Sequence, residues 1–173
     1  ALHRGPIVDV GWCALDVLHP TREDYLDESR KTNDRSCVIR VSNTRVSALL
    51  TADIEALSER EIIARSAANS ALKSDALLIP HHGSRTSSTP AFIDAVAPKI
   101  ALINAGYRNR FGHPREDVLA RYAERNITVL RTDWHGALTI SSVDGFARIQ
   151  SARDARQRYW VDRPDPTDAR PIE

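Results

Sequence analysis

The sequence predicts a layered α/β domain in which mixed β-sheets are covered by helices. Short all-apolar runs, typical of strands buried on both faces, alternate with helical patterns through the middle of the chain. Hairpin patterns stand towards both ends. The chain has 173 residues, 42% of them hydrophobic and 27% charged, which is enough for one domain with its own core.

The first third of the chain is predicted to be mainly strands. Residues 7–18 read as two short strands or one bent strand, and polar residues 21–36 lack any period and are predicted to be a loop. Residues 37–41 and 46–50, which are mostly apolar, flank a short polar turn, and this is a hairpin pattern. Asn43 in this turn is expected to take a positive φ.

The remaining elements alternate between helices and buried strands. The predicted helices cover residues 55–68, 90–97 with Thr89 as cap, and 115–125 after Pro114. The predicted strands cover residues 76–79, 100–103 and 127–130, followed by a closing hairpin of 137–140 with 146–149. We therefore expect a domain over residues 1–150 and an Arg- and Pro-rich tail over residues 151–173.

Composition limits the possible functions. The net charge is +1, from 24 basic and 23 acidic residues, so any affinity for nucleic acid must come from local patches or a bound metal. No apolar run is long enough to span a bilayer. The sequence starts at Ala1 and has no Met, so we expect it to be an excised piece of a longer protein or a processed product. Cys13 and Cys37 each fall in an expected strand, where a buried free thiol is the commoner outcome, although a disulfide between them stays open.

Polar residues gather where the predicted strands end. Asp53, the pair His81 and His82, and His113 all lie on loops that leave strands, and such loops converge at one edge of an α/β sheet. His and Asp together suit zinc, or manganese if more oxygen ligands join. The plainer alternatives are that Asp53 caps a helix and that His113 is a turn residue before Pro114.

The segment HHGS at residues 81–84 is the most informative part of the sequence. Adjacent side chains that leave a strand point to opposite faces, so one of His81 and His82 is expected to bind metal and the other to support it or face substrate. Gly83 permits a sharp turn, and Ser84 could hold an oxyanion. The alternative is a surface loop rich in Ser and Thr.

Five segments, in order, resemble the metallo-β-lactamase domain of ComEC-type DNA-uptake proteins. NDRSCV resembles the family's ND-x-S-x-V, LLTADIE its LLTGDIE, and HHGSRTSS its HHGSxTSS. NRFGHP resembles N-x-[YF]-G-H-P, and TDWHG resembles T-D-x-x-G. One such motif alone would be weak, but five with matching order and spacing indicate membership of this family.

The resemblance implies an αββα metallo-β-lactamase-like sandwich, of which this chain supplies the C-terminal half as a mixed sheet with flanking helices. It implies metal ligands at Asp53 and at His81 or His82, with His82 favoured, and a catalytic histidine near the substrate at His113. The expected substrate-binding residues are Asn33, Asp34, Ser84 and Arg110. Arg85 and Arg108 are further candidates for holding a DNA backbone, or else are solvated surface arginines.

The implied activity is metal-dependent phosphodiester hydrolysis, as a nuclease in natural transformation. The implied cofactor is a divalent metal, zinc or manganese, and the implied partners are DNA and the membrane-channel portion of the same polypeptide. The parent protein is expected in the bacterial inner membrane, with this domain outside the cytoplasm.

Two departures from the family pattern weaken the expectation of activity. Ala52 replaces the family's Gly before the aspartate, and the family's H-x-H-x-D-H and D-x-G-x-G segments do not occur in this sequence. We therefore expect the chain alone to bind metal weakly, to be inactive, and to associate with itself or another chain through an exposed sheet face. The rival interpretations are a non-catalytic binding or regulatory module with a degenerate site and a soluble small-phosphoester hydrolase of the same fold.

Overall fold

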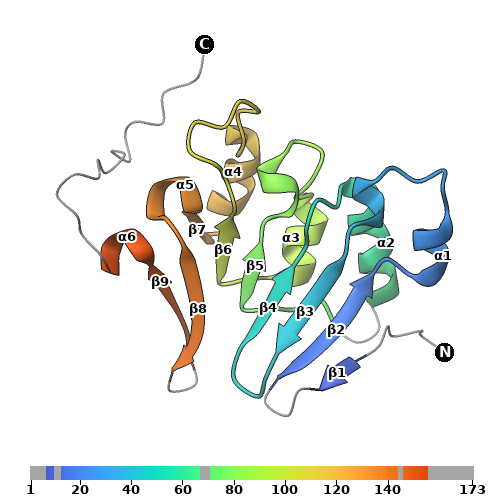
Figure 1. Ribbon diagram of the computed structural model, residues 1–173, viewed down its shortest axis with the longest axis horizontal. Helices are drawn as coiled ribbons and strands as arrows, with labels where there is room; N and C mark the ends of the chain where they lie inside the picture. Colours follow the sequence, from blue (N-terminus) through green and yellow to red (C-terminus); the bar gives the residue numbers. More distant parts are fainter. Residues whose placement is uncertain (1–6, 10–12, 67–70, 144–145, 156–173) are drawn as a thin grey trace.

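Seven strands form one mixed sheet whose spatial order follows the chain (Figure 1). The computed structural model describes residues 7–9, 13–66, 71–143 and 146–155. The strands are β1 (Ile7–Asp9), β2 (Ala14–His19), β3 (Val38–Ser42), β4 (Ser47–Leu50), β5 (Ala76–Leu78), β6 (Ile100–Ile103) and β7 (Thr128–Arg131). Strands β1 to β4 pair antiparallel, and β4 to β7 pair parallel.

The helices and a separate hairpin complete the fold. The helical segments are α1 (Arg22–Leu26), η1 (Asn33–Arg35), α2 (Ala56–Ser66), η2 (Pro80–Gly83), α3 (Pro90–Val96), α4 (Glu116–Ala123), α5 (Thr132–His135) and α6 (Ala152–Ala155). Strands β8 (Leu138–Val143) and β9 (Phe146–Ser151) form their own two-stranded sheet. In Figure 1 this hairpin stands beside the β7 end of the large sheet.

The core lies between the large sheet and helices α2, α3 and α4. Ile62 of α2, Phe92 of α3 and Tyr122 of α4 are fully buried, and they belong to the same apolar cluster as Leu49 and Leu77 of the sheet. These helices all lie behind the sheet in Figure 1. One face of the sheet is therefore closed by helices, and its apolar residues are excluded from water.

The other face of the sheet also carries apolar side chains, and several of these are only partly buried. Side chains alternate between the two faces along each strand, and directly paired residues share a face. Ile39 pairs with Leu50 and Val41 pairs with Ala48, so these four side chains lie on this second face. Leu50 is 40% exposed, and Ile39, Val41, Leu78 and Leu130 are all intermediate in burial. The sheet therefore has one closed face and one partly open apolar face.

Most of the expected elements are confirmed. The two N-terminal strands, the first hairpin, the three short buried strands and helices α2, α3 and α4 lie within a few residues of their predicted positions. Thr89 caps α3 by accepting a hydrogen bond from the backbone N–H of Phe92. The mixed α/β class is therefore confirmed.

Two local predictions were wrong. Residues 21–36, expected to be a loop, contain α1 and η1, because Thr21 and Asp24 form a reciprocal capping box. Asn43 does not take a positive φ; its side-chain oxygen instead accepts the backbone N–H groups of Arg45 and Val46 at 2.8 and 2.9 Å. Between β7 and the closing hairpin, for which no element was predicted, the chain forms the short helix α5.

The C-terminal elements and the two cysteines complete the described structure. Strand β9 runs to Ser151 and is followed by α6, while residues 156–173 of the predicted tail lie outside the described residues. Cys13 and Cys37 are both free thiols, and Cys37 is exposed rather than buried in a strand. No helix among the described residues is long and apolar enough to cross a bilayer.

Replacing the cap of α1 should destabilise the protein measurably. Thr21→Ala removes a side-chain oxygen that accepts the Asp24 N–H, and we expect the free energy of unfolding to fall by about 1 kcal/mol. Thr32→Ala is the matched control, because Thr32 precedes η1 without making a side-chain cap hydrogen bond. Urea denaturation measures both variants, and equal stabilities would contradict this account of α1.

Candidate functional site

The carboxyl ends of β4, β5 and β6 meet at one edge of the sheet, which is the upper edge in Figure 1. Because these three strands are parallel neighbours, the loops that follow them lie side by side. The loops comprise residues 51–55, 79–89 and 104–115. They carry Asp53, the histidine pair and His113, so the sequence-predicted convergence at one edge is confirmed.

Asp53 and His82 face each other across two of these loops. The Nε2 atom of His82 lies 3.6 Å from Oδ1 of Asp53, and both side chains are half-exposed. The other ring nitrogen, Nδ1, lies 2.6 Å from the backbone carbonyl of Asn104, which can only accept a hydrogen bond. Nδ1 therefore carries the proton of the neutral ring, and the lone pair of Nε2 points towards the carboxylate. Metal-binding histidines commonly have this second contact to a carbonyl.

His81 turns towards a different carboxylate. Its Nδ1 atom lies 3.5 Å from Oε1 of Glu55 and 3.3 Å from the hydroxyl of Thr86. Its ring centroid is 6.1 Å from that of His113. The two adjacent histidines thus diverge, each beside one acidic residue. Glu55 was not predicted as a site residue, although it belongs to the same motif as Asp53.

The backbone of both histidines is left-handed. His81 has φ 48° and His82 has φ 54°, so the pair lies in a turn and not in an extended strand. Their divergence was expected, but the alternation of side chains along a strand is the wrong reason for it. Ala52 has φ 45°, and its carbonyl accepts the His81 N–H at 3.0 Å. Such conformations cost about 1–3 kcal/mol each in residues other than Gly and concentrate at functional sites.

Gly83 brings the third loop against the histidines. It has φ +82°, and a Cβ atom there would lie 2.6 Å from Cβ of Pro114, closer than carbon atoms can approach. Its carbonyl also accepts the backbone N–H of Arg115 at 3.0 Å. Only glycine fits both the backbone angle and the space, so this contact fixes the loop of His113 beside His81 and His82.

His113 is held by its backbone and has a free ring nitrogen. The side chain of Asn109 donates to the His113 carbonyl at 2.6 Å and accepts the His113 N–H at 3.1 Å. The buried Nδ1 atom of His113 has no hydrogen-bond partner among the residues that the structure describes. Burial lowers the pKa of His113, and the positive charge of Arg115 lowers it further, so the ring is neutral near pH 7. A buried ring nitrogen without a partner favours contact with a bound ligand.

A buried carboxylate holds the loop that follows the histidines. Glu59 of α2 is fully buried and accepts the backbone N–H groups of Ser88 and Thr89. Burial raises the pKa of this carboxyl. Arg121 of α4 binds the carbonyls of Ser87 and Ser88 at 2.9 Å. No pattern in the sequence indicated this role for Glu59, because a Glu on a helix normally indicates an exposed charge.

The expected substrate-binding residues lie in different surroundings. Asn33 donates to Glu55 at 3.3 Å and so adjoins the site, and Arg110 is exposed on the third loop. Asp34 is buried, and its carboxylate accepts the Ser58 hydroxyl at 3.0 Å. The hydroxyl of Ser84 is also buried and shares a hydrogen bond with that of Thr86. The geometry therefore favours Asn33 and Arg110 as ligand contacts and gives Asp34 and Ser84 structural contacts instead.

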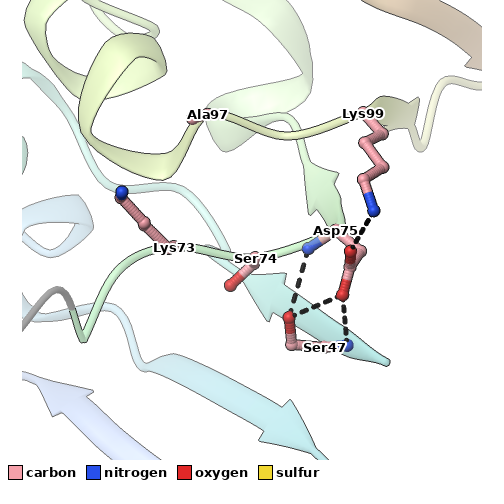
Figure 2. A pocket seen from close by; sticks show the side chains of 6 residues that line it. All are labelled: Ser47, Lys73, Ser74, Asp75, Ala97 and Lys99. Carbon is pink, nitrogen blue, oxygen red and sulfur yellow. Dashed lines mark hydrogen bonds and ion pairs between the residues drawn. The ribbon is translucent and has the colours of Figure 1, made fainter. Parts of the chain in front are cut away.

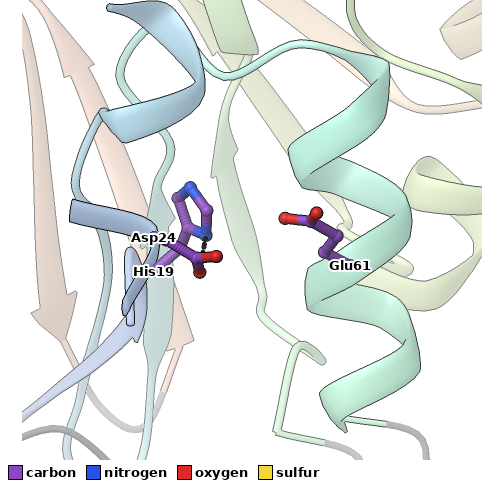
Figure 3. A group of neighbouring side chains, drawn as sticks. All are labelled: His19, Asp24 and Glu61. Carbon is purple, nitrogen blue, oxygen red and sulfur yellow. Dashed lines mark ion pairs between the residues drawn. The ribbon is translucent and has the colours of Figure 1, made fainter. Parts of the chain in front are cut away.

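One group of three potential metal ligands within the described part of the chain lies elsewhere, at His19, Asp24 and Glu61 (Figure 3). Arg30 pairs with Asp24 and Glu61, at 2.8 Å each, and Arg65 pairs with Asp24 at 3.1 Å. His19 Nε2 donates to the Asp34 carbonyl at 2.8 Å, and its Nδ1 accepts from Arg65 at 2.9 Å. Two guanidinium groups balance the two carboxylates, so this is an ion-pair network that joins α1 to α2.

A cavity of about 170 Å³ lies at the opposite edge of the sheet, before β5 and β6 begin (Figure 2). Asp75 in its wall accepts from the Ser47 hydroxyl at 3.0 Å and pairs with Lys99 at 2.9 Å. These contacts connect the starts of neighbouring strands. The cavity is therefore separate from the convergent loops and contains no histidine.

No protein-family model matches the chain, but sequence comparison finds related proteins. Competence protein ComA of Neisseria gonorrhoeae is 34% identical over 155 residues, 88% of this chain and 21% of that protein. ComE operon protein 3 of Bacillus subtilis is 33% identical over 78% of this chain and 16% of that protein. Recombination protein 2 of Haemophilus influenzae is 34% identical over 72% of this chain and 15% of that protein. The chain thus spans about a fifth or less of these relatives.

Adding one methyl group at Gly83 should separate the second and third loops. Gly83→Ala introduces a strained φ and a clash with Pro114, and we expect the free energy of unfolding to fall by about 3 kcal/mol. Gly106→Ala is the control, because its nearest neighbour would be 4.0 Å from the new Cβ. Thermal and urea denaturation give both values, and a Gly83→Ala protein as stable as the Gly106→Ala protein would contradict the close approach.

The ion-pair network predicts how stability depends on pH. Burial alone would raise the pKa of Asp24, but hydrogen bonds from Thr21 and the charges of Arg30 and Arg65 lower it below its ordinary value of 3.8. The ionised Asp24 carboxylate therefore contributes its full stabilisation above pH 3.8. This stabilisation is lost as the pH falls through the lowered pKa that Asp24 has in the folded protein.

The stability difference between wild type and Asp24→Asn tests this sign. Urea denaturation should give a constant difference from pH 7 down to about pH 5 and a shrinking difference in stronger acid. A difference that disappears already between pH 7 and pH 5 would be inconsistent with a lowered Asp24 pKa.

Proposed function

Because this chain is homologous to a segment of the ComEC-type competence proteins, we propose that it is part of a metal-dependent phosphodiester hydrolase used in natural transformation. The pairing of Asp53 with His82 is the observation that carries this proposal. A carboxylate and a correctly protonated imidazole meet at the sheet edge where α/β proteins commonly place their sites. DNA is the proposed substrate, in keeping with the relatives' names.

We further propose that the complete domain is an αββα sandwich of the metallo-β-lactamase type. The partly open apolar face of the large sheet supports this, because such a face is normally covered by a second layer. A second sheet from the same, much longer polypeptide would cover it. Self-association of the chain through this face is the expected substitute when that sheet is absent.

The residues present fit part of a divalent-metal site. His82 Nε2 and Asp53 would be ligands, and His81 with Glu55 offers a second imidazole and carboxylate nearby. Zinc or manganese suits this donor set. Two to four protein ligands on one side are too few for tight binding, so the chain alone is expected to bind metal weakly. The missing ligands would come from the second sheet.

A bound divalent ion would supply Lewis-acid stabilisation of charge on the phosphate. The rest of the chemistry belongs to residues of this chain. The neutral ring of His113, whose Nδ1 atom has no partner within the described ranges of the chain, would hydrogen-bond a phosphate oxygen or the leaving group. Arg110 would hold a neighbouring backbone phosphate, and Asn33 would keep Glu55 oriented towards His81.

A non-catalytic module is the second candidate, and Ala52 is the observation that favours it. Ala52 occupies a left-handed position, φ 45°, where the family pattern has Gly. This departure from the family pattern, directly before the proposed ligand Asp53, is the basis of the non-catalytic alternative.

For both candidate functions, we propose that the parent protein lies in the bacterial inner membrane with this domain outside the cytoplasm, in contact with the channel portion of the same polypeptide.

Manganese-dependent digestion of single-stranded DNA by the full-length parent protein tests the proposal. We expect cleavage that EDTA abolishes, and a loss of about 100-fold in Asp53→Ala and in His82→Ala, since each removes a metal ligand. Asp94→Ala is the matched control, because Asp94 is an exposed carboxylate that pairs with Arg125 on the outside of the helical layer. Equal cleavage by all four proteins would remove this mechanism, and no cleavage by wild type would favour the non-catalytic module.

A further inference from the structure

The third loop, residues 104–115, exposes two aromatic rings beside the candidate site. Tyr107 is 65% exposed and Phe111 is 60% exposed. Large apolar side chains at such exposure are uncommon within one short loop, because water solvates their faces poorly. Neither ring contributes to the core cluster. Their position therefore suits contact with another molecule.

Positive charge accompanies both rings. The guanidinium carbon of Arg108 lies 5.2 Å from the Tyr107 ring centroid, and that of Arg110 lies 5.1 Å from the Phe111 centroid. The sequence from residue 104 to 115 holds three arginines and no acidic residue. The protein's net charge is only +1, so this loop is a local cationic patch.

The rings continue as a series towards the candidate site. The Phe111 ring is stacked on that of His113, with centroids 6.3 Å apart and planes at 17°. His113 in turn is 6.1 Å from His81. A single strand of DNA that lay along Phe111 would therefore place its sugar-phosphate backbone near His113 and the Asp53–His82 pair.

The base of the loop is firmly held while its tip remains exposed. The side chain of Asn109 donates a hydrogen bond to the His113 carbonyl and accepts one from the His113 N–H, and Gly83 lies directly against Pro114. Because the base is fixed, the two rings need little further ordering when a ligand binds. This arrangement reduces the entropic cost of binding.

We propose that Tyr107 and Phe111 form a stacking platform for the bases of single-stranded DNA, with Arg108 and Arg110 contacting its phosphates. Aromatic faces with adjacent arginines bind unpaired bases without sequence preference. Duplex DNA hides its base faces within the stack and offers mainly phosphates and groove edges. The platform therefore selects single strands over duplexes. This inference takes its substrate class from the proposed function, but it does not depend on catalysis.

Fluorescence anisotropy with the full 173-residue chain in EDTA tests the platform without metal or cleavage. The probes are a labelled oligothymidylate, an abasic oligomer of the same length, and a duplex. We expect wild type to prefer oligothymidylate, and Tyr107→Ala/Phe111→Ala to lose about 30-fold in affinity for it, since each stacked base contributes about 1–3 kcal/mol. Affinity for the abasic oligomer and the duplex should change by less than about twofold, because neither presents a free base face.

Tyr25→Ala is the matched control, because Tyr25 of α1 is 64% exposed and lies on the opposite flank of the sheet (Figure 1). It should bind all three probes as wild type does. Arg110→Ala should instead reduce the dependence of affinity on salt. All variants change exposed side chains, and their melting temperatures should match that of wild type.

Three results would overturn the platform. The first is a wild-type protein that binds oligothymidylate no better than the abasic oligomer. The second is a double variant that loses affinity for all three probes equally, which would mean that the rings do not act on bases. The third is a double variant that loses no affinity, which would favour a protein partner as the ligand of the two rings. If wild type binds the three probes as expected but the full-length parent protein shows no manganese-dependent cleavage, the result would count against the proposed hydrolase and not against the platform.

Discussion

The parallel pairing of β4, β5 and β6 is the constraint on which the candidate site depends. Asp53, His82 and Asn104 follow three successive strands, and they meet only because those strands end at the same edge. The preceding strands pair antiparallel, so the pairing changes at β4. An antiparallel β5 would place the histidines at the edge that holds Ser47 and Asp75. The position of the site thus follows from the crossover helices α2 and α3.

Strain at the site is balanced by rigid supports around it. Ala52, His81 and His82 hold left-handed backbone angles, which are unfavourable for residues with a Cβ atom. Glu59 holds the loop of residues 79–89 through hydrogen bonds from within the core. Gly83 lies against Pro114 and so positions the loop of residues 104–115. These contacts stabilise the side-chain directions before any ligand binds. Pre-organisation of this kind favours a binding or catalytic role over a purely structural turn.

Sequence patterns predicted the elements whose signals are local. The apolar runs of β5 and β6 and the Thr89 cap are readable without tertiary structure, and so is the gathering of Asp53, His82 and His113 after strands. Helix α1 was missed because five residues give no period, and its capping box uses Asp24 in place of the usual Glu.

The burial of Asp34, Glu59 and Ser84 could not be predicted, since it depends on contacts with residues distant in the sequence. The role of Glu55 was missed for the same reason, because His81 approaches it only after the loops converge.

Paramagnetic line broadening by manganese tests the location of the metal-binding edge most directly. The histidine ring signals of the 173-residue chain would be followed during titration with small amounts of Mn²⁺, which detects even weak binding. The geometry predicts that His82 broadens first, that His81 and His113 follow, and that His19 stays sharp, because Arg30 and Arg65 already neutralise its acidic neighbours. Preferential broadening of His19, or uniform broadening of all histidines, would contradict the account.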